Sequence, residues 1–208
     1  NRWLWRMPVR RVEAEVLRDS ILQISGELLF EACGPPVPVM ADRDGKFVIG
    51  IENLNAGRPG AIIPLKGQDL RRSVYVQVRR SRRLTVLDTF DAPLMSPNCT
   101  QRSFSASATQ SLMLMNGDFH IARAEQLATR IIDEASNQLT PQLQFAWQLC
   151  YGRRPDPVEL TNSIKYVQQT ERSHREQDAK SDAKQQRQFA MASLCHALFS
   201  SNEFLYIE

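Results

Sequence analysis

The sequence predicts a mainly α fold of the α+β kind, a helical domain with a small antiparallel sheet inserted between residues 37 and 80. Apolar residues recur at helical spacing before residue 26 and again from residue 106 onward. Between these stretches, glycine and proline interrupt residues 33–70 so often that a long helix is excluded there. We expect residues 1–208 to form one domain, the C-terminal part of a larger protein, with sub-regions 1–105 (helix and sheet) and 106–208 (helices).

The first predicted element is an amphipathic helix over about residues 9–25. Pro8 suits a first helical turn, and apolar residues follow it at helical spacing. Gly26 then supplies a stop signal, because glycine readily takes the backbone conformation that ends a helix.

The inserted sheet is predicted from a hairpin and from one alternating segment. The turn-forming pair Asp44-Gly45 lies between the apolar runs 37–40 and 46–49, which is typical of a β-hairpin. Residues 73–79 carry valine at every second position, and this alternation predicts the clearest strand of the chain.

The second half predicts a series of helices separated by short breaks. Residues 116–118 (NGD) separate two helices, and the cap-then-proline pairs at 140–141 and 156–157 each open another. Gly152 ends the helix between those two pairs. Residues 171–188 carry almost no large apolar side chain, which indicates either a solvated helix extension or a mobile linker.

Composition limits the function classes. No apolar run reaches the roughly 20 residues that cross a bilayer, so no membrane span is expected. A net charge of +3 is too small to predict nucleic-acid binding. The arginines concentrate in one stretch, which we interpret as an exposed strand edge with protective charges, or else as a site for phosphate, sulfate or an acidic glycan. These residues are Arg71, Arg72, Arg79, Arg80, Arg82 and Arg83.

The cysteines and histidines predict neither a metal site nor haem in this chain. The three histidines have no spacing that places two on one helix face, whereas zinc needs three or four converging ligands. Cys195-His196 lacks the second cysteine of a haem-attachment motif, because position 192 is alanine. The disulfide pairing is left open for the four cysteines, Cys33, Cys99, Cys150 and Cys195.

Polar residues that could form a ligand site gather in the irregular segment 88–116. In the functional interpretation, Asp91 accepts hydrogen bonds, Arg102 binds an anion, and the amides of Gln110 and Asn116 position a ligand near Cys99. In the structural interpretation, Asp91 caps a turn, Arg102 pairs with a buried acid, and Asn116 ends a helix. Both interpretations remain open at this point.

A second pair of carboxylates lies on the first predicted helix. Glu15 and Asp19 are four residues apart, so they share a helix face and could in principle act together as acid and base. Arg11 and Arg18 occupy positions three or four residues away on the same face. We therefore expect ion pairs on the helix surface.

Short motifs along nearly the whole chain together resemble one family. They are residues 10–22 (RRVEAEVLRDSIL), 34–36 (GPP), 72–75 (RSVY), 90–93 (FDAP), 99–102 (CTQR), 110–112 (QSL), 114–116 (LMN) and 201–206 (SNEFLY). In this order they resemble the planctomycete-type secreted-protein domain of unknown function, DUF1553. The resemblance implies an exported protein, periplasmic or extracellular, in which this domain lies C-terminal to other domains, often behind a cytochrome-c-like domain. Any haem would then be bound upstream, with no cofactor in this chain.

Two functions are compatible with this resemblance. The first is an accessory or structural module, with Trp3 and Trp5 packed against the upstream part of the protein or against another chain. The alternative is a domain that binds or processes an anionic polysaccharide through Arg79, Arg80 and Arg102 together with Asp91. The resemblance carries over no catalytic residue.

Overall fold

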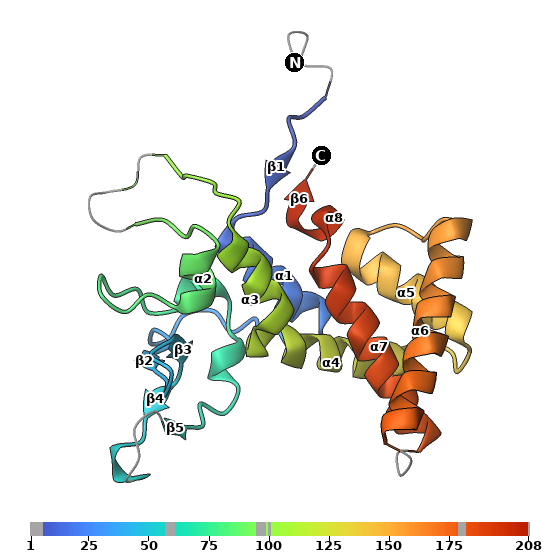
Figure 1. The fold of residues 1–208 in the computed structure, drawn as a ribbon. Helices are drawn as coiled ribbons and strands as arrows, with labels where there is room; N and C mark the ends of the chain where they lie inside the picture. The colour runs from blue at the N-terminus through green and yellow to red at the C-terminus, as the bar shows by residue number, and fades with distance from the viewer. Residues whose placement is uncertain (1–5, 57–60, 95–98, 100, 179–181, 208) are drawn as a thin grey trace. The chain divides into compact units, whose positions relative to one another are not determined.

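The computed structural model describes residues 6–56, 61–94, 99, 101–178 and 182–207. It confirms the predicted fold class, since helices predominate and the strands are short and form two-stranded sheets (Figure 1). Trp3 and Trp5 lie outside the described residues.

The chain divides into two compact units. The first, here the N-terminal unit, contains Arg11–Gln23 and Glu27–Met113. The second, the C-terminal unit, contains Asn1–Arg10, Ile24–Gly26 and Leu114–Glu208. Whether the chain is one domain, as the sequence predicts, stays a prediction.

The N-terminal unit has one long helix and many short elements. The helix α1 begins at Ala14, five residues after the predicted start, and ends at Ile24, before Gly26 with its positive φ of 81°. The other elements of this unit are β2 (Val39–Ala41), β3 (Phe47–Ile49), β4 (Ile51–Glu52), β5 (Ile62–Ile63) and α2 (Thr85–Thr89), with 3-10 turns at Leu54–Ala56, Gln68–Leu70 and Ser73–Tyr75. The strand β1 (Arg10–Arg11) and the helix α3 (Ala108–Asn116) each have residues in both units.

The predicted hairpin is confirmed. Strands β2 and β3 are antiparallel, with Val39 opposite Ile49. In the turn, the Asp42 carboxylate accepts hydrogen bonds from the backbone N–H groups of Asp44 and Lys46, at 2.9 and 2.8 Å. Gly45 adopts a φ of 77°, a conformation that glycine takes without steric cost. Local turn chemistry therefore determines this element.

The strand predicted over residues 73–79 is wrong. Residues Ser73–Tyr75 form a 3-10 turn, and only Val76 makes an isolated parallel bridge, to Val37. The cause is Asp19, whose Oδ1 accepts hydrogen bonds from the backbone N–H of Ser73 at 2.7 Å and from its hydroxyl at 2.6 Å. Because this carboxylate binds the first residue of the segment, the turn replaces strand pairing.

Two arginines predicted to be at the surface are buried instead. Arg18 is 2% exposed and Arg71 is 1% exposed. Arg18 donates hydrogen bonds to the carbonyl oxygens of Arg71 at 2.9 Å and Asp69 at 2.8 Å. It therefore holds α1 against the turn that precedes Ser73, rather than forming only a helix-surface ion pair.

Arg71 holds a second loop. Its guanidinium donates hydrogen bonds to the carbonyl oxygens of Pro35, at 2.9 Å, and Cys33, and it lies 4.0 Å from the centre of the Tyr75 ring. The loop around Gly34 thus folds over a cation. Five N–H donors in a planar group let arginine satisfy several carbonyls at once, which explains why a charge can be buried here.

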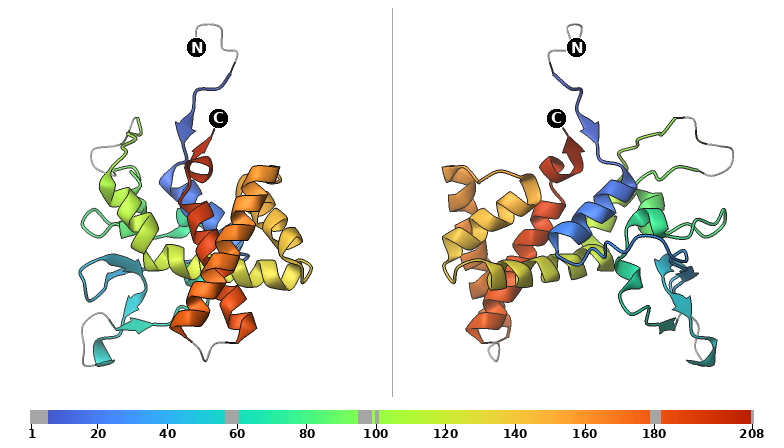
Figure 2. Two further views of the ribbon diagram at one scale, coloured as in Figure 1. Left: turned by 45° about the vertical axis from the view of Figure 1, so that its right-hand side comes forward. Right: turned by 180° about the vertical axis from the view of Figure 1, so that it is seen from behind.

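The C-terminal unit is a set of packed helices. Its elements are α4 (Asp118–Glu134), α5 (Leu139–Tyr151), α6 (Pro157–Gln177), α7 (Ala183–Phe199), α8 (Asn202–Leu205) and β6 (Tyr206–Ile207). Helices α6 and α7 lie side by side in both views of Figure 2, and α4 also packs on α7. The fully buried residues Leu127, Ile131, Val167 and Phe199 belong to these three helices.

Most of the predicted helix ends in this unit are confirmed. The Asp156 carboxylate accepts hydrogen bonds from the N–H groups of Val158 and Glu159 at the start of α6, and Gly152 ends α5 with a φ of 71°. Helix α5 begins at Leu139, one residue before the predicted cap. Residues up to Gln177 extend α6, so this part of 171–188 is a helix extension.

A buried histidine occupies the first turn of α4. Burial, and secondarily the charge of nearby His196, lowers the pKa of His120 to about 4. The Nε2–H of His196 donates to the carbonyl oxygen of Leu114, 2.6 Å away. His120 therefore stays neutral in the folded chain under conditions where it is protonated in the unfolded chain.

We predict that acid destabilises the chain through His120. Below the ordinary pKa of 6.5, His120 is protonated in the unfolded state. In the folded state it stays neutral until the pH reaches its lowered pKa of about 4. The free energy of unfolding therefore decreases as the pH falls from 6.5 to about 4. The expected contribution is roughly 2 kcal/mol between about pH 7 and pH 5. Urea unfolding of wild type and His120→Gln at both pH values measures it. An identical pH dependence in the two proteins would contradict the prediction.

We predict that Arg71→Met destabilises the chain by about 3 kcal/mol or more, because buried carbonyl groups lose charged donors. Arg72→Met is the matched control. The Arg72 side chain is 56% exposed and its ion pair with Asp19 is 3.8 Å long, so we expect a loss below about 1 kcal/mol. Urea unfolding compares the two, and equal losses would argue against a structural role for Arg71.

Candidate functional site

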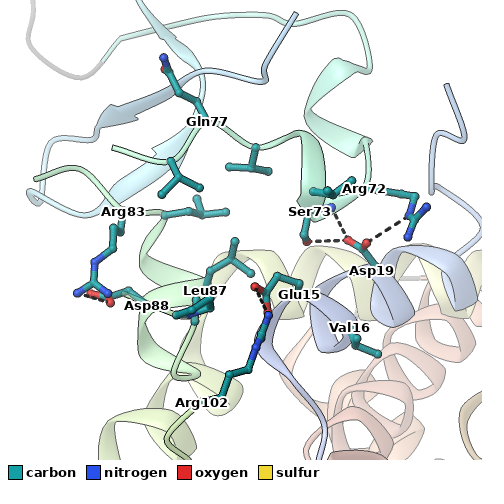
Figure 3. Close-up of a pocket in the computed structure, with 16 residues that line it drawn as sticks. Glu15, Val16, Asp19, Arg72, Ser73, Gln77, Arg83, Leu87, Asp88 and Arg102 are labelled. Carbon is teal, nitrogen blue, oxygen red and sulfur yellow. Dashed lines mark hydrogen bonds and ion pairs between the residues drawn. The ribbon is translucent and has the colours of Figure 1, made fainter. Parts of the chain in front are cut away.

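A pocket of ≈ 400 Å³ opens on the N-terminal unit (Figure 3). Its walls come from α1, from the segment around Val76, from α2 and from residues that follow α2. The lining residues are Glu15, Val16, Asp19, Arg72, Ser73, Val74, Val76, Gln77, Val78, Arg83, Leu84, Leu87, Asp88, Ala92, Pro93 and Arg102. Val76, Leu84 and Leu87 are buried and form an aliphatic base. The volume falls within the range of small-ligand pockets.

Arg102 and Glu15 form the strongest charged contact in the pocket. Arg102 Nη1 lies 2.7 Å from Glu15 Oε2, and Nη2 lies 3.2 Å from Oε1, so the pair is bidentate. Glu13 approaches the same guanidinium at 3.3 Å. The hydrogen bond with Glu15 raises the pKa of Arg102 above its ordinary value, and the negative charges of both acids add to the effect.

The other two acids of the pocket are engaged as well. Asp19 accepts two hydrogen bonds from Ser73 and lies 3.8 Å from Arg72. Asp88 Oδ1 lies 2.7 Å from Arg83 Nη2. Each lining acid therefore faces a lining arginine, as the dashed lines of Figure 3 mark. Helical spacing predicts ion-pair partners for Glu15 and Asp19 only on their own helix. The partners Arg102, Ser73 and Arg72 lie on other segments, so the spacing along α1 could not predict them.

Two of the predicted site residues, Asp91 and Gln110, contact each other. Gln110 Nε2 lies 3.2 Å from Asp91 Oδ2. The backbone N–H and the hydroxyl of Ser105 both donate to the Asp91 carboxylate, each at 2.8 Å. Arg11 completes the group, with Nη1 3.9 Å from Asp91 Oδ2 and 2.6 Å from Gln110 Oε1.

This cluster closes the chain segment between Asp91 and Ser105. Arg11 also donates to the Ser105 carbonyl oxygen, and its guanidinium lies 5.1 Å from the centre of the Phe90 ring. Asp91 has a φ of 64°, which is uncommon for a residue other than glycine and is held here by these contacts. Helical or strand spacing does not predict that Arg11 and Ser105 join this cluster, because they lie 94 positions apart in the chain.

The remaining predicted residues do not join this cluster. Cys99 is exposed, and its thiol lies 3.2 Å from the carbonyl oxygen of Gln101. Asn116 is exposed at the end of α3 and belongs to the C-terminal unit. Arg79 and Arg80 are exposed. The basic stretch is therefore not one surface, because it includes the buried Arg71.

A family model matches residues 1–167. The chain belongs to the family PSD1, protein of unknown function (DUF1553). Comparison with curated proteins and with solved structures finds no match. Of the motifs that carry the resemblance, only residues 201–206 fall outside the matched part of this DUF1553 chain.

Burial divides the cysteines of this DUF1553 chain into the exposed Cys33 and Cys99 and the more enclosed Cys150 and Cys195. All four cysteines are free thiols. Burial raises the pKa of Cys150 to about 12 and that of Cys195 well above its ordinary value, so neither is a ready nucleophile. Among the described residues, no three His, Cys, Asp or Glu side chains are grouped so that they could hold a metal ion. Over the same residues, no helix has the length and apolar character of a membrane span.

We predict that Arg102→Ala lowers the free energy of unfolding by about 1 kcal/mol, because Glu13 and Glu15 lose their shared cation. Arg79→Ala, at an exposed position, is the control and should change stability by less than about 0.5 kcal/mol. Thermal unfolding measures both. Loss of sulfate binding in Arg102→Ala at an unchanged melting temperature would instead support an anion-binding role for this residue.

Proposed function

We propose that this DUF1553 chain is an accessory module that binds a partner through its pocket and performs no reaction there. The observation that carries the proposal is that each acid lining the pocket is engaged by an arginine. A carboxylate that is paired with an arginine is a poor general base or nucleophile, because the cation holds the electron pair that the reaction would use. Both oxygens of Glu15 accept hydrogen bonds from Arg102, Asp19 is engaged by Ser73 and Arg72, and Asp88 is paired with Arg83 through Oδ1.

We further propose that the module belongs to an exported multidomain protein of planctomycete type, periplasmic or extracellular. The support is the resemblance of its motifs to the secreted-protein domain. In this proposal a cytochrome-c-like domain upstream holds haem and this chain holds no cofactor. The upstream chain, or another chain, packs on the N-terminal end that carries Trp3 and Trp5.

The polysaccharide alternative has one observation in its favour. The side chains of Arg79 and Arg80 are exposed, and none of the described acids lies within ion-pair distance of them. Its other two residues, Arg102 and Asp91, are engaged by protein groups. Among the described residues that line the pocket, none carries an aromatic ring on which a sugar could stack. We therefore favour the accessory module.

Truncation of the full-length protein tests the proposal. We predict that the full-length protein and a version ending before Asn1 are both recovered from the exported fraction. The truncated version should keep the turnover and the absorbance spectrum of the upstream domain. Its melting temperature should fall, because the upstream domain loses a partner that packs against it. Recovery in the cytosol would contradict export. Complete loss of turnover at an unchanged spectrum would show that this chain carries out the reaction.

A further inference from the structure

A tight turn places three arginines at the edge of the pocket. The backbone N–H of Arg82 donates to the carbonyl oxygen of Arg79 at 3.3 Å, which closes the turn. The turn joins Val78 to Arg83, and both of these residues line the pocket. Arg79, Arg80 and Arg82 are therefore held at its edge by chain continuity.

These arginines give the site an excess of positive charge. Their side chains are exposed, and within the described ranges no ion pair engages them. The acids of the pocket and the adjacent Glu13 are already shared with Arg72, Arg83 and Arg102. A ligand with negative charge would therefore be attracted to this edge.

Exposed aliphatic side chains form the other half of the site. Val16, Val74 and Val78 are 48%, 70% and 56% exposed, and all three line the pocket above the buried Val76. Branched aliphatic groups that gather in an open pocket are typical of an interaction surface. They favour an aliphatic group as the part of the ligand that enters.

The same segment has an open backbone edge. The N–H of Val37 donates to the Tyr75 carbonyl at 2.7 Å, and the N–H of Gln77 donates to the Val37 carbonyl at 2.8 Å. In an extended segment the intervening groups point the opposite way. The carbonyl of Val76 and the N–H of Val78 have no hydrogen-bond partner among the described residues. A peptide backbone can satisfy both.

We propose that the pocket binds an extended, acidic polypeptide segment whose aliphatic side chain enters between Val74 and Val78. The segment's carboxylates meet the arginine turn, and its backbone pairs with the edge at Val76 and Val78. This proposal deepens, and rests on, the proposed function as a binding module. The backbone edge favours a polypeptide over a fatty acid or a glycan, because neither offers a peptide N–H and C=O at strand spacing.

Fluorescence anisotropy with a labelled peptide, Glu-Asp-Leu-Val-Asp-Glu, tests the proposal on the 208-residue chain. We expect saturable binding that weakens about tenfold in Arg79→Gln/Arg80→Gln/Arg82→Gln, since each exposed charge contributes modestly. Val78→Asp should weaken it at least as much. The matched control Arg154→Gln/Lys165→Gln/Arg172→Gln removes three exposed cations of the C-terminal unit and should leave binding unchanged. Circular dichroism and melting temperature verify that each variant is folded.

Peptide variants separate the contributions. Replacement of Leu-Val by Ser-Ser should abolish binding, and methylation of the central backbone nitrogens should weaken it because the edge hydrogen bonds are lost. Equal weakening by the control variant, or no effect of Val78→Asp, would show non-specific charge attraction and overturn the proposal. Decanoate or heparin binding with the same variant profile, while the peptide fails to bind, would overturn it as well. Truncation of the full-length protein does not depend on this pocket, so the accessory role is judged separately.

Discussion

Two buried guanidinium groups, those of Arg18 and Arg71, place a strict requirement on the N-terminal unit. A buried charge without partners costs several kcal/mol, so each must be surrounded by acceptors. Main-chain carbonyls supply them: Arg18 binds those of Asp69 and Arg71, and Arg71 binds that of Pro35. These hydrogen bonds of Arg18 and Arg71 join α1, the turn before Ser73 and the loop around Gly34. The short strands of this unit would contribute little stability by themselves.

The pocket depends on the same hydrogen bonds of Arg18. Arg18 holds the turn beside α1, and Asp19, the next residue, then binds Ser73 through its backbone N–H and its hydroxyl. That contact starts a 3-10 turn in a segment with strand-like alternation, and so leaves Val74 and Val78 exposed at the pocket. The open edge and the aliphatic rim are therefore consequences of the polar contact between Asp19 and Ser73.

The polar segment after α2 has two separate roles. Asp91, Ser105, Gln110 and Arg11 bind one another and close the segment, which agrees with the structural interpretation of Asp91 as a turn residue. Arg102 instead reaches the acids of α1 and contributes a wall of the pocket. Residues that form one group in the sequence thus act at two places, and the charged residues of segment 88–116 that line the pocket are Arg102 and Asp88.

The mainly α class, the hairpin at Asp44-Gly45 and the helix boundaries at Gly152 and Asp156 could be predicted from local sequence, because they depend on backbone preference and on caps a few residues away. The burial of Arg71, the turn at residues 73–75 and the pairing of Glu15 with Arg102 could not be predicted in this way. Each of these involves a contact between residues more than 35 positions apart. Such contacts produce no periodic pattern of apolar residues in the sequence. A buried arginine also has the same kind of neighbouring residues in the sequence as an exposed one.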